Sequence, residues 1–425
     1  MSRPEKDVEE MAEHAEVLTP QEMLQQFEKV NVCGECLHEA PNTLRKLVRY
    51  SKLPFRQLVA QYETHITYTP MLLAQEFSRS AIARDSDFST NTLERGTFWM
   101  TPKVNHIPVQ EWDSSPERRS EEPLARKARR GQRRVRGNLV AQFAANDATQ
   151  LADAAELIKP WVDGIDLNCE IERLTPSVEP LSRRTGCPQK WAYQEGIGCA
   201  LLRKPDTVRD LVRTTKQRLG WDFPVTVKIR VDPNLQLTNE LVTTAIAAGA
   251  DVLAIHGRTR HQSSSGHPVN LDSIQFAVEC SKGQIPCVAN GDVFDLEGAE
   301  ETRRRCGVNA VMSARGLLAN PVSWHGKAGR LRTLFVLTAH SLQALFSGYD
   351  KTPFTAISEF VRISTQVGLI YPLFHRHVAY MIESHFTLRM DRVFFNGLTS
   401  YASVCDYLVD ELGVNLGGAE EKVSV

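Results

Sequence analysis

The stretch that decides the fold is VTVKIRVDPNLQLTNELVTTAIAAGADVLAIHGRT, residues 225–259. Its two ends, VTVKIR and VLAIHGRT, are rich in β-branched residues and predict strands. Between them, NELVTTAIAAGA from Asn239 carries apolar residues at helical spacing. A strand, a helix and a second strand in this order are typical of two parallel strands joined by a crossover helix.

The same unit recurs along the chain. The predicted strands are a segment near Val30 to Cys36, ITYTPML from Ile66, NLVAQFAAND from Asn138, GIDLNC from Gly164, VTVKIR from Val225, VLAIHGRT from Val252, IPCVANGD from Ile285 and AVMSARG from Ala310. Other helix-like stretches are ATQLADAAELI from Ala148, TVRDLVRTTKQRL from Thr207 and LDSIQFAVEC from Leu271. Eight β/α units in about 280 residues predict an α/β fold, a closed (β/α)8 TIM barrel rather than an open doubly wound sheet.

Length and composition limit the class of protein. The 425 residues suffice for one to three domains, and a hydrophobic content of 42% supports a sizeable core. Lys and Arg total 50 against 51 Asp and Glu, so the net charge of −1 gives no global reason to bind nucleic acid or membrane. No apolar run reaches the length of a membrane span, and the acidic N-terminus lacks the pattern of a signal peptide. We therefore expect a cytosolic or nuclear protein that does not bind membranes.

The cysteines give no sign of a disulfide framework. Nine cysteines are an odd number without regular spacing, which predicts reduced thiols. Cys33 and Cys36 form a CxxC pair, but no second pair and no pair of histidines follows to complete a zinc site. We interpret this pair as part of a loop and predict no bound metal.

Polar residues end six of the predicted strands. They are Gln142, Asn168, Lys228, His256 with Arg258, Asn290 with Asp292, and Ser313 with Arg315. In a (β/α)8 barrel these carboxyl ends lie on one face, where the following loops build the ligand site. Any one of them could be a loop residue that happens to follow a strand. Six in succession favour a binding site.

Two of these strand ends indicate a phosphorylated cofactor. Asn290-Gly291-Asp292 and Ala314-Arg315-Gly316 combine glycine, backbone N–H groups and a cation where barrels commonly hold a phosphate. Lys228 is a lone charge at the end of VTVKIR, and burial without a partner would be costly. It therefore needs an anionic or electron-accepting partner, which the N1 and O2 edge of a flavin would provide.

Several phrases of this sequence resemble those of the tRNA-dihydrouridine synthases. They are LVRYSKLPFRQLV, YTPMLLAQEF, RDSDFSTN, VAQFAANDA, GCPQKWA, VKIR, IHGRT, VANGD and MSARGLLANP. These motifs are most similar to those of the fourth eukaryotic class, which acts on the adjacent D-loop uridines 20a and 20b. The resemblance runs from about Val30 to Val414. It implies a flavin-binding barrel followed by a small helical domain that grips tRNA.

The resemblance also implies a reaction. A flavin oxidoreductase of this family uses FMN, with NADPH or NADH as hydride donor, to reduce uridine to 5,6-dihydrouridine in the tRNA D-loop. Cys187 in Gly-Cys-Pro-Gln matches the general acid that protonates uracil C5 while reduced FMN delivers a hydride to C6. No G-x-G-x-x-G follows a strand, so the nicotinamide would visit the flavin face directly. We expect the enzyme to be a monomer.

Other site residues follow from the same resemblance. The flavin-ring contacts that it implies are Gln142 and Lys228, and His256 matches a residue beside the flavin. The phosphate contacts are Asn290, Gly291, Asp292, Ala314 and Arg315. Asn168 matches the residue that faces the uracil, and Arg258 is expected to assist it. Pro41 lies at the first-strand flavin contact, where Asn42 or the residues after it replace a Met of the family.

The predicted domains are an N-terminal extension over 1–29, an FMN-binding barrel over 30–346, a helical tRNA-binding domain over 347–414 and a tail over 415–425. In the third domain, Phe360 to Val378 and His385 to Leu398 carry apolar residues at helical spacing. The cations interleaved with them are Arg362, His375, Arg376, Arg389 and Arg392. By themselves they fit an ordinary solvated helix face, and the resemblance favours a tRNA-binding surface.

Four irregular insertions interrupt the family pattern, near 42–47, 92–137, 170–185 and 323–343. The third parts Asp166-Leu167-Asn168-Cys169 from Gly186-Cys187-Pro188, which the family joins directly. The second contains LARKARRGQRRVR, either an RNA-binding or nuclear-localising arm or a segment without selected chemistry. Long irregular loops within a compact domain favour the interpretation that these are translated introns retained in a gene model.

Two alternatives stay open. The split active-site loop is compatible with a catalytically impaired or inactive homologue that only binds tRNA. A flavin barrel that reduces free pyrimidines is the other alternative, although a small substrate needs no basic helical tail. Flavin absorbance of the purified protein would exclude the simple binding protein, and turnover of free uracil would exclude the tRNA enzyme.

Overall fold

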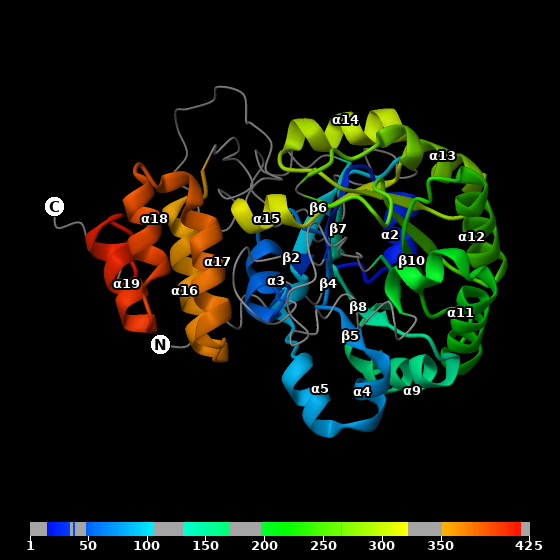
Figure 1. Ribbon diagram of the computed structural model, residues 1–425, viewed down its shortest axis with the longest axis horizontal. Helices are drawn as coiled ribbons and strands as arrows, with labels where there is room; N and C mark the ends of the chain where they lie inside the picture. The colour runs from blue at the N-terminus through cyan, green and yellow to red at the C-terminus, as the bar shows by residue number, and fades with distance from the viewer. Residues whose placement is uncertain are drawn as a thin grey trace, which may run out of the picture.

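The computed structural model describes residues 15–34, 37–38, 48–104, 131–170, 197–264, 266–321 and 351–417. Within these ranges eight parallel strands form a barrel, with a helical region to one side (Figure 1). The strands are β1 (Val30–Cys33), β4 (Ile66–Tyr68), β8 (Asn138–Ala144), β9 (Gly164–Cys169), β10 (Val225–Arg230), β11 (Val252–His256), β12 (Cys287–Asn290) and β13 (Ala310–Ser313). The ring closes because β1 pairs with both β13 and β4, and β4 pairs with β8. The predicted TIM barrel and its eight strands are confirmed.

Helices surround the strands. They are α3 (Leu53–Val59), α4 (Ala74–Arg79), α5 (Ala81–Asp87), α9 (Ala148–Ile158), α11 (Pro205–Leu219), α12 (Leu235–Ala247), α13 (Leu271–Ser281), α14 (Leu296–Cys306) and α15 (Arg315–Ala319). Their starts follow local signals: the Asp147 side chain accepts from the Gln150 amide at 2.8 Å to cap α9, and Pro205 begins α11. Figure 1 shows α9 and α11 to α14 as an outer arc along one side of the barrel.

Shorter elements complete the described barrel. They are β2 (Leu37–His38), β3 (Val48–Arg49), β5 (Leu72–Leu73), η1 (Leu93–Arg95), η2 (Lys159–Trp161) and η3 (Gly198–Arg203). β2 and β3 form an antiparallel pair, and β5 adds a second pairing to β8 beyond Pro70, which interrupts the predicted strand ITYTPML. A proline has no N–H to donate, which explains the break.

Strand alternation sorts the side chains into two environments. Odd-numbered residues such as Leu167, Val227 and Ile255 form an apolar layer with the surrounding helices. Even-numbered residues, such as Val140 and Val252, belong to the cluster inside the barrel. Successive side chains of a strand point to opposite faces, so one phase of each strand packs on helices and the other fills the interior.

Apolar side chains close the amino-terminal end of the barrel. α2 (Pro20–Gln26) begins with a capping box between Thr19 and Glu22. β6 (Thr97–Met100) pairs antiparallel with β7 (Arg133–Arg136). The buried side chains that these elements pack under the barrel interior are Met23, Leu24, Phe27, Phe98, Met100 and Val135. Part of the predicted N-terminal extension and both described ends of the predicted 92–137 insertion therefore belong to the barrel core.

The helical region follows the barrel and packs directly on it. It consists of α16 (Phe354–Val367), α17 (Tyr371–Ile382), η5 (Glu383–His385), α18 (Arg389–Asn396) and α19 (Tyr401–Asp410). The predicted helix from Phe360 to Val378 is divided at Gly368, whose φ of +69° ends α16. No helix among the described residues is long and apolar enough to cross a membrane.

A buried histidine fixes the contact between this region and α3. The His377 Nε2–H donates to the carbonyl oxygen of Tyr50 at 2.9 Å, and its ring stacks on Phe55 with 4.9 Å between centroids. Burial lowers the pKa of His377 to about 4, so the imidazole is neutral at pH 7. The helical region and the barrel thus share one apolar interface.

Candidate functional site

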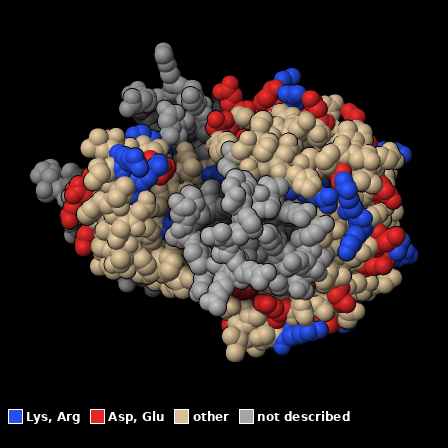
Figure 2. Space-filling view, in the orientation of Figure 1, with Lys and Arg blue, Asp and Glu red and all other residues tan. Residues whose placement is uncertain are grey.

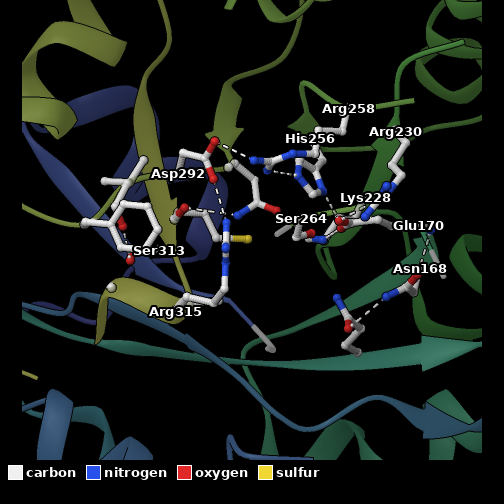
Figure 3. Close-up of a pocket in the computed structure, with 18 residues that line it drawn as sticks. Asn168, Glu170, Lys228, Arg230, His256, Arg258, Ser264, Asp292, Ser313 and Arg315 are labelled. Carbon is white, nitrogen blue, oxygen red and sulfur yellow. Dashed lines mark hydrogen bonds and ion pairs between the residues drawn. The ribbon is translucent and has the colours of Figure 1, made fainter. Parts of the chain in front are cut away.

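A pocket opens at the carboxyl ends of six consecutive strands, β8 to β13 (Figure 3). It brings together every site residue predicted from the sequence that the structure describes. They are Gln142, Asn168, Lys228, His256, Arg258, Asn290, Gly291, Asp292, Ala314 and Arg315. The other two predicted residues, Cys187 and Pro41, lie outside the described residues.

A chain of hydrogen bonds orients two amides on one side of the pocket. Gln142 Nε2 donates to Asp166 Oδ2 at 2.8 Å, and Asn168 Nδ2 donates to Gln142 Oε1 at 3.0 Å. Asp166 also accepts from Thr226 Oγ1 at 2.5 Å. Burial raises the pKa of Asp166, and the hydrogen bonds from Thr226 and Gln142 oppose that shift. Asp166 was not predicted as a site residue, although it shares the inward phase of β9 with Asn168.

Three cationic or N–H-donating side chains meet on one carboxylate at the pocket floor. Lys228 forms an ion pair with Glu170 Oε2, His256 Nδ1 contacts Glu170 Oε1, and Arg230 Nε lies 3.6 Å from Oε1. Lys228 and Arg230 are alternate residues of β10, so both point inward. The sequence analysis missed Arg230, which this two-residue period could have found. It also missed Glu170, the first residue of the predicted third insertion.

The protonation of His256 follows from its neighbours. Arg258 Nη1 lies 3.1 Å from His256 Nε2. A guanidinium can only donate, so Nε2 accepts and the ring proton resides on Nδ1, facing Glu170. Burial, followed by the charges of Arg230, Lys228 and Arg258, lowers the pKa of His256 well below its ordinary value. His256 is therefore a neutral donor at the pocket floor.

Asp292 holds two arginines at the opposite wall. Its Oδ2 accepts from Arg258 Nη2 at 2.5 Å, and its Oδ1 accepts from Arg315 Nη2 at 2.6 Å. Although burial acts to raise it, the hydrogen bond from Arg258 keeps the pKa of Asp292 below its ordinary value. The Asp292 carboxylate therefore orients Arg315, and the predicted phosphate contact, which involves backbone N–H groups, stays a prediction.

Arg258 is also almost fully buried, and hydrogen bonds to protein groups fix its side chain. Its side chain is 1% exposed, and Nε donates to the carbonyl oxygen of His267 at 2.7 Å. Together with the bonds to His256 and Asp292, this contact engages three of its nitrogen atoms. These contacts give Arg258 an orienting role, and its predicted assistance to the uracil contact stays a prediction.

Glycine is required where the chain passes close to His256. Gly291 has a φ of +121°, and a Cβ there would lie 3.1 Å from His256 Cδ2 and 2.8 Å from Val269 Cγ2. No other residue type adopts this backbone conformation without strain. Arg315 lies on the next strand end, with its guanidinium 5.2 Å from the Phe294 ring centroid and its side chain 26% exposed. A cation here remains accessible to a ligand.

The helical region presents a second candidate surface. The exposed residues of α18 include Arg389, Met390, Arg392 and Phe394. Figure 2 shows Lys and Arg side chains gathered over α18 on the visible face. Arg392 pairs with Glu383, and Arg362 pairs with Glu359 at 2.5 Å. His375 donates to the Phe395 carbonyl oxygen at 2.9 Å. The predicted cations therefore do not form one uniform surface.

Within the described ranges, no three His, Cys, Asp or Glu side chains are grouped as they would be to hold a metal ion. Cys33 is buried and reduced, and Cys36 lies outside the described residues. The other described cysteines are also free thiols.

The fold and the pocket define a class of protein: a (β/α)8 barrel with a cationic ligand site at the carboxyl ends of its strands. The chain belongs to the dihydrouridine synthase (Dus) family, whose model matches residues 44–333. The predicted family is confirmed.

Relatives agree with this assignment. The chain is 35% identical to a human tRNA-dihydrouridine(20a/20b) synthase-like protein over 399 residues, which cover 93% of this chain and 95% of the relative. It is 37% identical to the NAD(P)+ tRNA-dihydrouridine(20a/20b) synthase of Schizosaccharomyces pombe over 362 residues, 85% of each chain. Identity to the tRNA-dihydrouridine(16/17) synthase of the same yeast is 26% over 295 residues, 69% of this chain and 59% of that relative.

Proposed function

We propose that this protein reduces uridine to 5,6-dihydrouridine in the tRNA D-loop, at positions 20a and 20b, with FMN as cofactor and NADPH or NADH as reductant. The observation that carries the proposal is the convergence of Lys228, His256 and Arg315 at the carboxyl end of a Dus-family barrel. The higher identity to the 20a/20b relatives than to the 16/17 relative supports the choice of positions.

The described side chains have the chemistry that FMN needs. Arg315 is a partly exposed cation held by Asp292, and it is assigned to the phosphate. The Gln142 amide, the Lys228 ammonium and the Nδ1–H of His256 are donors, and they are assigned to the acceptor edge of the flavin ring. Charge-assisted bonds of this kind are stronger than neutral ones, so both ends of the cofactor would be anchored.

The chemistry divides between the cofactor and the protein. FMN bound in this pocket would supply, after reduction by NADPH or NADH, the hydride for uracil C6. Asn168, oriented by Gln142, is assigned to the uracil and would hold it in place. Cys187 donates the proton to C5, which completes the saturation of the C5–C6 bond. Its assignment rests on the Gly-Cys-Pro motif.

The exposed face of α18 is assigned to the tRNA. Arg389 would neutralise a backbone phosphate, as would Arg392 once it leaves its ion pair with Glu383. Phe394, 62% exposed, would stack on an unpaired base. The shared interface around His377 would hold this face in a fixed position relative to the pocket. We propose that one chain carries both surfaces and acts as a monomer.

Conversion of unmodified tRNA tests the proposal. The protein is incubated with tRNA, FMN and NADPH, and dihydrouridine at 20a and 20b is measured by mass spectrometry. The wild type should form dihydrouridine, and Cys187→Ala should lower its rate at least about hundredfold because the proton donor is lost. Cys405→Ala in α19, far along the chain in the helical region, is the matched control and should leave the rate unchanged.

Three results would contradict parts of the proposal. Full activity of Cys187→Ala would remove the general-acid assignment. Binding of tRNA and flavin without conversion would favour the inactive homologue. Reduction of free uracil at a rate similar to that of tRNA would favour a pyrimidine reductase.

A further inference from the structure

Glu170 enters the pocket from the end of β9, and its backbone is held on both sides. The Glu170 amide donates to Asn168 Oδ1 at 2.7 Å, and its carbonyl oxygen accepts from Cys199 Sγ at 3.0 Å. These contacts direct the side chain toward β10 and β11, and only 12% of it is exposed (Figure 3). Glu170 therefore belongs to the pocket floor.

Its carboxylate engages the donors that the proposed function assigns to the cofactor ring. Lys228 is ion-paired with Glu170 Oε2, and the Nδ1–H of His256 points at Oε1. Arg230 Nε lies 3.6 Å from the same oxygen. A carboxylate presents two acceptor oxygens side by side, much as the N1 and O2 edge of a flavin presents two acceptors. Glu170 and the ring edge therefore share two assigned partners, Lys228 and His256.

We propose that Glu170 is an intramolecular competitor of the flavin ring and sets the cofactor affinity of this chain. The proposal rests on the proposed flavin function of the pocket. Bonds from cations to a carboxylate are stronger than bonds to a neutral acceptor, so the ring gains these donors only when Glu170 leaves them. When a site is competent in only a fraction of molecules, its apparent affinity falls by that fraction.

The competition has a specific signature because the ring site and the phosphate site are separate. Glu170 contacts Lys228, Arg230 and His256, whereas Arg315 is held by Asp292. Loss of the Glu170 charge should therefore tighten binding of FMN and of riboflavin by the same factor, since both carry the same ring. An effect transmitted through the phosphate site would change FMN alone.

Flavin titration of the full chain tests this inference. Quenching of flavin fluorescence gives Kd for FMN and for riboflavin with the wild type, Glu170→Gln, Glu170→Ala and Glu240→Gln. We expect both Glu170 variants to bind each flavin at least about tenfold tighter, a difference that corresponds to competent donors in about one wild-type molecule in ten. Glu240 is exposed on α12, so its variant is the matched control and should bind as the wild type does.

The outcomes separate this inference from the proposed function. Equal or weaker flavin binding by both Glu170 variants would overturn the competition while leaving the flavin pocket in place; weaker binding would mean that Glu170 orients Lys228 for the cofactor. Tightening of FMN without riboflavin would also overturn it. If neither the wild type nor the variants bound either flavin, both the inference and the proposed function would fail.

Discussion

The two ends of the barrel interior differ in chemistry although the same strands supply both. Along β11 the inward side chains run from Val252 through Ala254 to His256, and along β10 they run from Thr226 to Lys228 and Arg230. The amino end is sealed by apolar side chains, and the carboxyl end is lined by cations. Burial of apolar side chains stabilises a fold, whereas burial of charged side chains costs desolvation free energy. We therefore expect the charged end to be kept for ligand binding. The comparison predicts that mutations at the two ends have opposite consequences.

The largest expected effect on stability is at the sealed end. Phe27 is fully buried beneath the barrel, and Phe27→Ala should lower the free energy of unfolding by about 3 to 5 kcal/mol because it leaves a cavity. Flavin affinity of the folded protein should not change. Urea denaturation and flavin titration measure the two quantities.

Val17 is the control for this variant, since its side chain is 66% exposed. Val17→Ala should change the free energy of unfolding by less than about 0.5 kcal/mol. A cost below about 1 kcal/mol for Phe27→Ala, or a large loss of flavin affinity, would contradict the division of roles between the two ends.

The second-largest expected effect on stability is at the buried interface between the barrel and the helical region. Burial lowers the pKa of His377 to about 4, below the value of about 6.5 expected in the unfolded chain. The unfolded state therefore binds the proton more readily, so this contribution to stability is complete above about pH 6.5 and is lost as the pH falls toward 4. The total loss is about 3 kcal/mol.

Denaturation of His377→Gln between pH 4 and 7 measures this contribution. Glutamine retains an N–H donor for the Tyr50 carbonyl oxygen but does not titrate, so the variant should lose less stability than the wild type on acidification. His261 is exposed, and His261→Gln should keep the wild-type pH dependence. Identical pH profiles for the wild type and His377→Gln would contradict a lowered pKa of His377 in the folded protein.

The sequence was sufficient to predict the eight strands and the polar residues at their carboxyl ends. Both follow from local signals, because strand period and composition are properties of neighbouring residues. Gly368 and Pro372 likewise could have marked the break between α16 and α17. Arg230 could have been found by its two-residue spacing from Lys228.

Other features depend on contacts between distant residues and had no local signal. The pairing of β6 with β7 joins residues 97–100 to residues 133–136. Its buried side chains are explained only by the barrel interior that they pack against. Arg258 was expected to assist at the substrate, but its orientation is decided by Asp292, 34 residues away. Glu170 reaches the pocket because its backbone is held by Asn168 and Cys199, which sequence spacing does not reveal.

The central claim is that the carboxyl end of this barrel is a flavin site anchored through phosphate by Arg315. The most direct measurement is Kd for FMN and for riboflavin with the wild type, Arg315→Ala and the control Arg304→Ala, whose side chain is 75% exposed on α14. Hydrogen bonds to charged groups contribute about 1.5 to 3 kcal/mol, so Arg315→Ala should weaken FMN binding roughly ten- to hundredfold and riboflavin binding less than about twofold. Arg304→Ala should change neither. Equal losses for the two flavins, or no loss of FMN affinity, would contradict the claim.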